Sequence, residues 1–99
     1  MEISDEELYG RYNQKIQQQI ESYNVVYRNC INAIKTTSKR GDLIHVFEIP
    51  SILVEKMFTK INPELCADYI INQLSNTNKN IKAEFISPNV LFLDWSKQT

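Results

Sequence analysis

Residues 81–95, IKAEFISPNVLFLDW, decide the fold, because they hold two strand-forming runs on either side of a Ser-Pro-Asn turn. Branched and aromatic residues dominate both runs, whereas serine, proline and asparagine favour turns. A loop of three residues, 87–89, would place Phe85 opposite Leu91 in an antiparallel pair. The segment therefore predicts a β-hairpin with a defined register.

This register divides the side chains of the hairpin between two faces, because successive strand residues point to opposite sides. One face is apolar throughout and consists of Ile81, Ala83, Phe85, Leu91, Leu93 and Trp95. On the other face Lys82 would lie opposite Asp94. Near the turn this outer face also carries three apolar side chains, Ile86, Val90 and Phe92, which are either covered by the domain or form a contact patch.

A helix is predicted just before the hairpin, from Pro63 to about Ser75. Asn62 supplies the N-cap, Pro63 the first helical residue and Glu64 an acid in the first turn. The apolar side chains on one side of this helix are Cys66, Tyr69, Ile70 and Leu74. Residues 51–60 show a shorter helical pattern, so a second helix is expected there, with a strand as the alternative.

Residues 43–49, LIHVFEI, predict a strand, because they are rich in branched and aromatic residues and Pro50 follows them. Apolar side chains occur at both alternating positions, which is typical of a strand in the middle of a small sheet. His45, the one histidine of the chain, is expected on the same side as Leu43 and Phe47.

A long helix is predicted at the N-terminus, over about residues 5–38. Ser4 and Glu7 have the spacing of a capping box, and Gly41 can end the helix in the left-handed conformation. Apolar residues recur at steps of three and four along one face, namely Tyr12, Ile16, Ile20, Tyr23, Tyr27, Ile31 and Ile34. Their mean step, about 3.7 residues, exceeds the 3.5 of a left-handed coiled coil, so a straight helix on a core is favoured over a coiled-coil rod.

The rest of the chain is too small to cover this helix. A helix of about 33 residues extends about 50 Å, whereas a compact chain of this length has a radius of gyration of about 13 Å. The helix therefore breaks, for example at Gly10, or it overhangs and a second copy or another partner covers it. We predict an interface at Tyr9, Tyr12 and Tyr23, in a homodimer or with a protein partner.

The elements give the order α-β-α-α-β-β in a single domain of 99 residues, with an α/β core at about 42–95. The expected fold class is α+β with a small three-stranded antiparallel sheet, and the order is that of a winged helix. If residues 51–60 are not helical, two helices on a three-stranded sheet remain.

Composition and motifs argue against catalysis and ligand binding. No catalytic motif surrounds His45, and two glycines leave little scope for a phosphate-binding loop. Cys30 and Cys66 lie on apolar helix faces without the spacing of a metal site. We therefore expect no enzyme activity, cofactor, metal or small-molecule substrate.

The sequence also bears on location. The N-terminus lacks the features of a signal peptide, and the longest apolar run has four residues, far below the roughly 20 that cross a bilayer. We expect a soluble intracellular protein with reduced cysteines and no membrane contact.

Nucleic-acid binding is the alternative function. The net charge of -1 disfavours nonspecific DNA packaging, and the helix that a winged helix would insert into DNA contains Glu64 and Asp68 but no Lys or Arg. A candidate anion patch lies in residues 35–60 instead, with Lys35, Lys39, Arg40, Lys56 and Lys60.

Residues 30–95 resemble a group of short uncharacterised proteins from nucleocytoplasmic large DNA viruses. The similar stretches are CINAIK at 30–35, VFEIP at 46–50, Cys66 with Tyr69-Ile70 and Leu74, and PNVLFLDW at 88–95. The resemblance implies a viral protein in the host cytoplasm or the virion, and it implies no activity. We therefore expect a non-enzymatic interaction or structural module that associates with itself.

Overall fold

The computed structural model describes residues 3–56 and 58–96, without the side chains of residues 11–15 and of Glu55. Its elements are, in chain order, α1 (Asp5–Lys39), β1 (Ile44–Glu48), β2 (Ile52–Leu53), the 3-10 turn η1 (Val54–Lys56), β3 (Thr59–Lys60), α2 (Pro63–Thr77), β4 (Lys82–Ile86) and β5 (Val90–Asp94). Strands β1, β5 and β4 form an antiparallel sheet in that order, and β2 pairs with β3. The α+β class and the three-stranded antiparallel sheet are confirmed.

The two long helices, α1 and α2, have the caps that the sequence indicated. The Ser4 side chain accepts a hydrogen bond from the Glu7 amide at 3.3 Å, and the Asn62 side chain accepts one from the Leu65 amide at 3.1 Å. At the other end of α1, Gly41 takes a φ of 88°, a left-handed conformation that glycine adopts without a steric cost. The helix continues through Gly10, so α1 is one element of 35 residues, about 52 Å long.

The hairpin of β4 and β5 has the predicted register. Phe85 lies opposite Leu91, and Lys82 lies opposite Asp94. Leu91 and Leu93 are fully buried on the inner face, whereas Ile86 is exposed on the outer face. The odd loop length therefore assigned each side chain to the correct face of the sheet.

Strand β1 is an edge strand, so its predicted central position was wrong. It pairs with β5 alone, and β5 is the middle strand. His45 and Phe47 point toward the core, but the other apolar positions, Ile44 and Val46, are exposed. Apolar residues on both faces of β1 thus reflect a sheet with one covered and one uncovered face, rather than burial on both sides.

The described part of residues 51–60 forms a small hairpin instead of the expected helix. Ile52 pairs with Lys60 and Leu53 with Thr59, and η1 lies between the two short strands. Leu53 is buried in the core while its neighbours Ile52 and Val54 are exposed, an alternation that suits a strand and not a helix face. A winged-helix arrangement needs a helix in this place, so the body is described by two helices on a three-stranded sheet.

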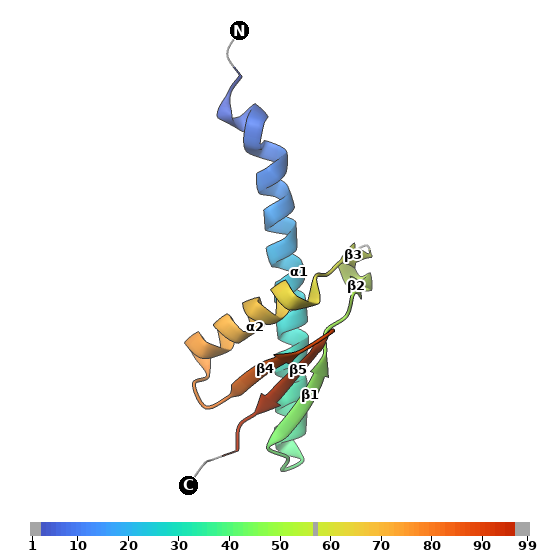
Figure 1. The fold of residues 1–99 in the computed structure, drawn as a ribbon, viewed down its shortest axis with the longest axis vertical. Helices are drawn as coiled ribbons and strands as arrows, with labels where there is room; N and C mark the ends of the chain where they lie inside the picture. The colour runs from blue at the N-terminus through green and yellow to red at the C-terminus, as the bar shows by residue number, and fades with distance from the viewer. Residues whose placement is uncertain (1–2, 57, 97–99) are drawn as a thin grey trace.

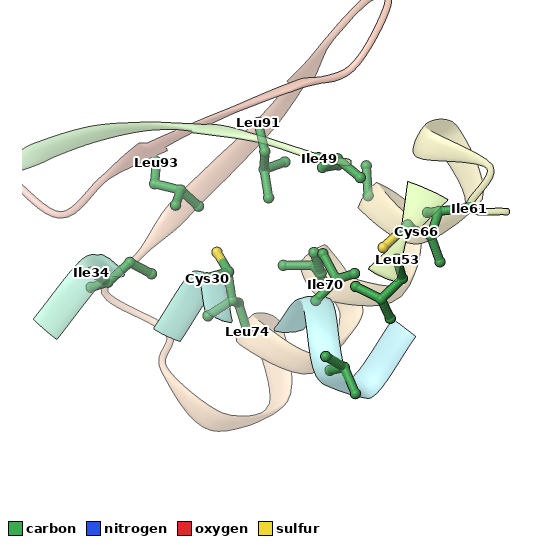
Figure 2. Packing of buried hydrophobic residues seen from close by; sticks show 13 residues of the cluster. Cys30, Ile34, Ile49, Leu53, Ile61, Cys66, Ile70, Leu74, Leu91 and Leu93 are labelled. Carbon is green, nitrogen blue, oxygen red and sulfur yellow. The ribbon is translucent and has the colours of Figure 1, made fainter. Parts of the chain in front are cut away.

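The core lies between the inner face of the sheet, α2 and the C-terminal half of α1 (Figure 1). Figure 2 shows its length: Leu93 faces Ile34 at one end, and Leu53 and Ile61 lie at the other. The buried face of α1 is rotated by roughly a quarter turn from the predicted stripe, so that Val26 and Cys30 are fully buried and Tyr27 and Ile31 flank the core.

The N-terminal part of α1 projects beyond this core, as Figure 1 shows. The chain measures 66 Å along its longest axis and 27 and 23 Å across, and its radius of gyration is 16.7 Å. That radius exceeds the roughly 13 Å of a compact chain of 100 residues. Of the two alternatives that the sequence left open, a break or an overhang, the structure has the overhang.

Two leucines of α2 provide a direct test of the core. Leu74 is 1% exposed and Leu65 is 54% exposed. We expect Leu74→Ala to lower the free energy of unfolding by about 2–5 kcal/mol, because it leaves a cavity, and the matched control Leu65→Ala to lower it by less than about 1 kcal/mol. Urea denaturation followed by circular dichroism measures both, and equal losses would contradict the core described above.

Candidate functional site

One exposed apolar feature is on the overhang, which we define as residues 5–21 of α1. The side chains of Leu8, Tyr9, Ile16 and Ile20 are all exposed, Leu8 to 54%. At 100° per residue, Leu8 is in line with Val26, and Ile16 is in line with Ile34, both of which face the core further along the helix. Ile20 lies about 40° beyond Ile16, in the direction of the flanking Tyr27 and Ile31. Tyr12 belongs to the stretch whose side chains lie outside the described part. The apolar stripe of α1 thus continues past the end of the core.

Ser22 marks the root of the overhang. Its hydroxyl is buried and donates a hydrogen bond to the Gln18 carbonyl oxygen at 2.9 Å, and the buried apolar residues of α1 begin at Val25. A helical segment of this length is marginal when no other part of the protein packs against it. The overhang is therefore held by its continuity with the packed half of α1, by the Ser4 cap and by three acids in the first turn, Asp5, Glu6 and Glu7.

Tyr23 lies apart from the other tyrosines that the sequence assigned to an interface. Its ring centroid is 5.9 Å from that of Tyr69, with the planes tilted by 47°, and Tyr69 donates a hydrogen bond to Asn24. Burial raises the pKa of Tyr23, and the nearby Cys66 thiol adds to this increase. The structure thus places Tyr23 against α2, at the edge of the core, and Tyr9 on the exposed overhang.

A second exposed apolar area covers the outer face of the sheet. The predicted trio of Ile86, Val90 and Phe92 lies there, with Ile86 exposed and the other two half-buried. Val46 of β1 is the direct neighbour of Phe92, and Val90 pairs with Ile86. We call Ile44, Val46, Ile86, Val90 and Phe92 the outer sheet surface. The contribution of β1 was missed because a central position had been predicted for that strand.

The five predicted basic residues form two groups. Lys35, Lys39 and Arg40 lie at the C-terminal end of α1, where β1 begins, whereas Lys56 and Lys60 belong to the β2–β3 hairpin beyond the other end of β1 (Figure 1). A five-residue strand separates the two ends by about 17 Å. The structure therefore does not join these residues in one anion patch.

A groove between α1 and the end of α2 contains a cation that the sequence analysis overlooked, Arg28. The groove encloses about 430 Å³ and is lined by Tyr27, Arg28, Ile31, Asn32, Lys35 and Thr77, with Asn78 beside them. The last turn of α2 has no basic residue of its own. Arg28 and Lys35 thus place positive charge near the negative end of the α2 dipole. Arg28 and Lys35 are seven residues apart and therefore lie on one face of α1, and this spacing was the sequence feature that could have identified them as a pair.

The remaining candidate residues are engaged within the fold. The Nδ1 atom of His45 is 3.0 Å from the hydroxyl oxygen of Thr37, a buried residue of α1. Cys30 and Cys66 are fully buried free thiols of the core. In the described part of the chain, no group of three or more His, Cys, Asp or Glu side chains could hold a metal ion. Within the same part, no helix has both the length and the apolarity for a membrane span.

Comparison with known proteins gives a family and a viral relative. The profile of a "Family of unknown function (DUF5759)" matches residues 3–75. "Uncharacterized protein R447" of Acanthamoeba polyphaga mimivirus is 40% identical over 98 residues, which cover 99% of this chain and 80% of that protein. No solved structure matches the chain. The viral resemblance seen in the sequence is therefore confirmed.

The two cysteines give a prediction about pH. Burial raises the pKa of Cys30 and of Cys66 from 9.0 to about 12, and for Cys30 the neighbouring Cys66 adds to the increase. Between about pH 9 and 12 the unfolded chain therefore loses thiol protons that the folded chain keeps, so the free energy of unfolding decreases as pH rises. Urea denaturation at pH 8 and pH 10 measures the difference.

The same burial controls thiol reactivity, because the thiolate is the reactive form. At pH 8 we expect a thiol reagent to label Cys30 and Cys66 only as fast as the chain unfolds, with the urea-unfolded chain as the positive control. Immediate labelling of both thiols in the folded protein would contradict the burial described above.

Proposed function

We propose that this chain, which belongs to the DUF5759 family of unknown function, is a non-enzymatic interaction module that associates with itself through the overhang of α1. One observation carries the proposal: Leu8, Ile16 and Ile20 are exposed within about 120° of one another on a helical segment that projects beyond the core. The family match begins at residue 3, so the overhang belongs to the part of the chain that resembles the family.

The energetics of the stripe favour a partner. Removing one leucine or isoleucine side chain from water contributes about 1.5–3 kcal/mol, and a two-fold dimer uses each residue of the stripe twice. A second copy is the simplest partner, because an amphipathic helix face is complementary to another of the same kind. Self-association thus converts the exposed face of the overhang into a small two-helix core.

The charges of the overhang favour an antiparallel pair. In a parallel pair the acidic first turns of both copies, Asp5, Glu6 and Glu7, would lie side by side and repel each other. An antiparallel pair keeps the two acidic turns at opposite ends of the shared helix segment. It also places the two bodies at opposite ends, so they do not collide.

The outer sheet surface is a second candidate for contact. It faces away from both helices, and Val46 on its edge strand β1 is 57% exposed. A chain with contact surfaces on the overhang and on the sheet can bind two neighbours at once, which suits a structural role. For a chain with a mimivirus relative, we place that role in the host cytoplasm or the virion.

Nucleic-acid binding has less support. Helix α2 contains no Lys or Arg, and the two groups of basic residues lie at opposite ends of β1. Without a continuous basic surface, the phosphate contacts that dominate such binding would be few.

Substitutions on the overhang test the proposal. We expect Ile16→Lys/Ile20→Lys to raise the dimer dissociation constant more than about 100-fold, because two buried apolar contacts per copy are replaced by charges. The control Gln17→Lys/Gln18→Lys adds the same charge to the opposite side of the same helix and should leave the constant within about threefold of the wild type. Sedimentation equilibrium over a concentration series measures all three proteins.

The salt dependence separates the two functions. A dimer at both 50 and 500 mM salt, unchanged by a short DNA duplex, supports the proposal, whereas a monomer that binds DNA only at low salt supports the nucleic-acid alternative. A wild-type chain that stays monomeric up to about 200 μM would refute self-association, since that concentration exceeds the dissociation constant of a weak dimer.

A further inference from the structure

We propose that the β2–β3 hairpin is the docking site for the first turn of α1 from a second copy of the chain. The proposal rests on the self-association proposed above and specifies where the end of each overhang binds. We define the hairpin surface as Val54, Lys56, Phe58 and Lys60, whose side chains are all exposed. The occupant consists of Asp5, Glu6, Glu7, Leu8 and Tyr9 of the partner copy.

The hairpin stands at the end of the core from which the overhang leaves. Leu53 and Ile61 anchor it in the same buried cluster as Val25 and Val26, which are the first buried apolar residues of α1. Figure 1 shows β2 and β3 beside the middle of α1, and Figure 2 shows Leu53 and Ile61 at the corresponding end of the core. A helix that packs along the overhang toward the body therefore arrives beside the hairpin.

The overhang is long enough for the first turn of α1 from the partner to reach the β2–β3 hairpin. Residues 5–21 extend about 25 Å at 1.5 Å per residue. When two such segments pair antiparallel over their full length, residue 5 of one copy lies level with residue 21 of the other. Residue 21 immediately precedes the root of the overhang at Ser22, so each first turn ends next to the body of its partner.

The two surfaces are complementary in charge. The first turn of α1 carries three exposed carboxylates, whereas the hairpin surface carries two exposed ammonium groups, Lys56 and Lys60. Opposite charges across an interface favour one orientation and exclude others. Lys56 and Lys60 are too far from the C-terminal end of α1 to form an anion patch with it, but they can bind the partner's acidic first turn.

The two surfaces also match in apolar character. Val54 and Phe58 are 67% and 69% exposed, and the partner would bring Leu8 and Tyr9. Phe58 has a φ of 60°, a left-handed conformation that non-glycine residues rarely adopt and that a bulky side chain makes less favourable still. The fold thus holds a large aromatic ring away from its own core, where it is available to anchor a partner.

A charge exchange tests this pairing. Lys56→Glu/Lys60→Glu and Asp5→Lys/Glu6→Lys each place like charges across both contacts of a homodimer, so each should weaken self-association at least about tenfold at 50 mM salt. An equimolar mixture of the two variants should form a heterodimer of near wild-type affinity, because one of its contacts is wild type and the other is a reversed complementary pair. Native mass spectrometry and sedimentation measure the species formed.

Two controls distinguish a local contact from a general effect of charge or folding. Lys35→Glu/Lys39→Glu makes the same charge change at the other end of the sheet and should leave the association unchanged. Phe58→Gly suits the left-handed backbone and should weaken association without lowering the melting temperature of the chain. If the Phe58 ring makes no contact with the partner, this variant associates like the wild type, and that result would contradict the proposed role of Phe58 as an anchor.

The outcomes separate this proposal from the one on which it rests. If Ile16→Lys/Ile20→Lys abolishes the dimer while Lys56→Glu/Lys60→Glu leaves it unchanged, the overhang associates but the hairpin is not its docking site. Failure of the exchange mixture to form a heterodimer would overturn the hairpin proposal in the same way. A wild-type chain that is monomeric throughout would overturn both.

Discussion

The structure depends on a difference in length between α1 and everything that packs on it. Sheet strands of five residues and a second helix of 15 residues cover only the C-terminal half of a 35-residue helix. The apolar face of α1 nevertheless continues past the core, because Leu8 is in line with Val26 and Ile16 with Ile34. The same helical pattern therefore lies in two environments. In the first half of the helix it is exposed, and in the second it forms the core.

Much of the fold could be predicted because its determinants are local. The caps at Ser4 and Asn62 and the left-handed Gly41 fixed the helix bounds, since each acts within a few residues. The hairpin register followed from a loop of odd length, which alone decides whether Phe85 faces Leu91. These features depend on the backbone geometry of neighbouring residues and not on the rest of the chain.

The errors concern features that depend on distant contacts. β1 has the composition of a central strand, but strand order is set by which strand β5 pairs with on its second edge. In residues 51–60, the burial of Leu53 against α1 outweighs a helical spacing of apolar residues. The five basic residues lie within 26 positions of the sequence, 35–60, yet β1 separates Lys39 from Lys56 in space. For the same reason the sequence does not reveal that Arg28 and Lys35 lie beside the C-terminal end of α2.

The candidate surfaces show which part of a binding site a sequence can reveal. The overhang and its exposed Tyr9 were predictable, because the length of a helix relative to its core can be calculated from the sequence. The hairpin surface was not predictable, because Phe58 belongs to the helical pattern of residues 51–60 and its left-handed backbone has no sequence signal. The overhang and the hairpin surface are related by position, because the overhang leaves the body beside the hairpin. They are also opposite in the sign of their charge. An acidic first turn and a basic hairpin on the same chain can satisfy each other only across two copies, since about 25 Å of rigid helix keeps them apart within one.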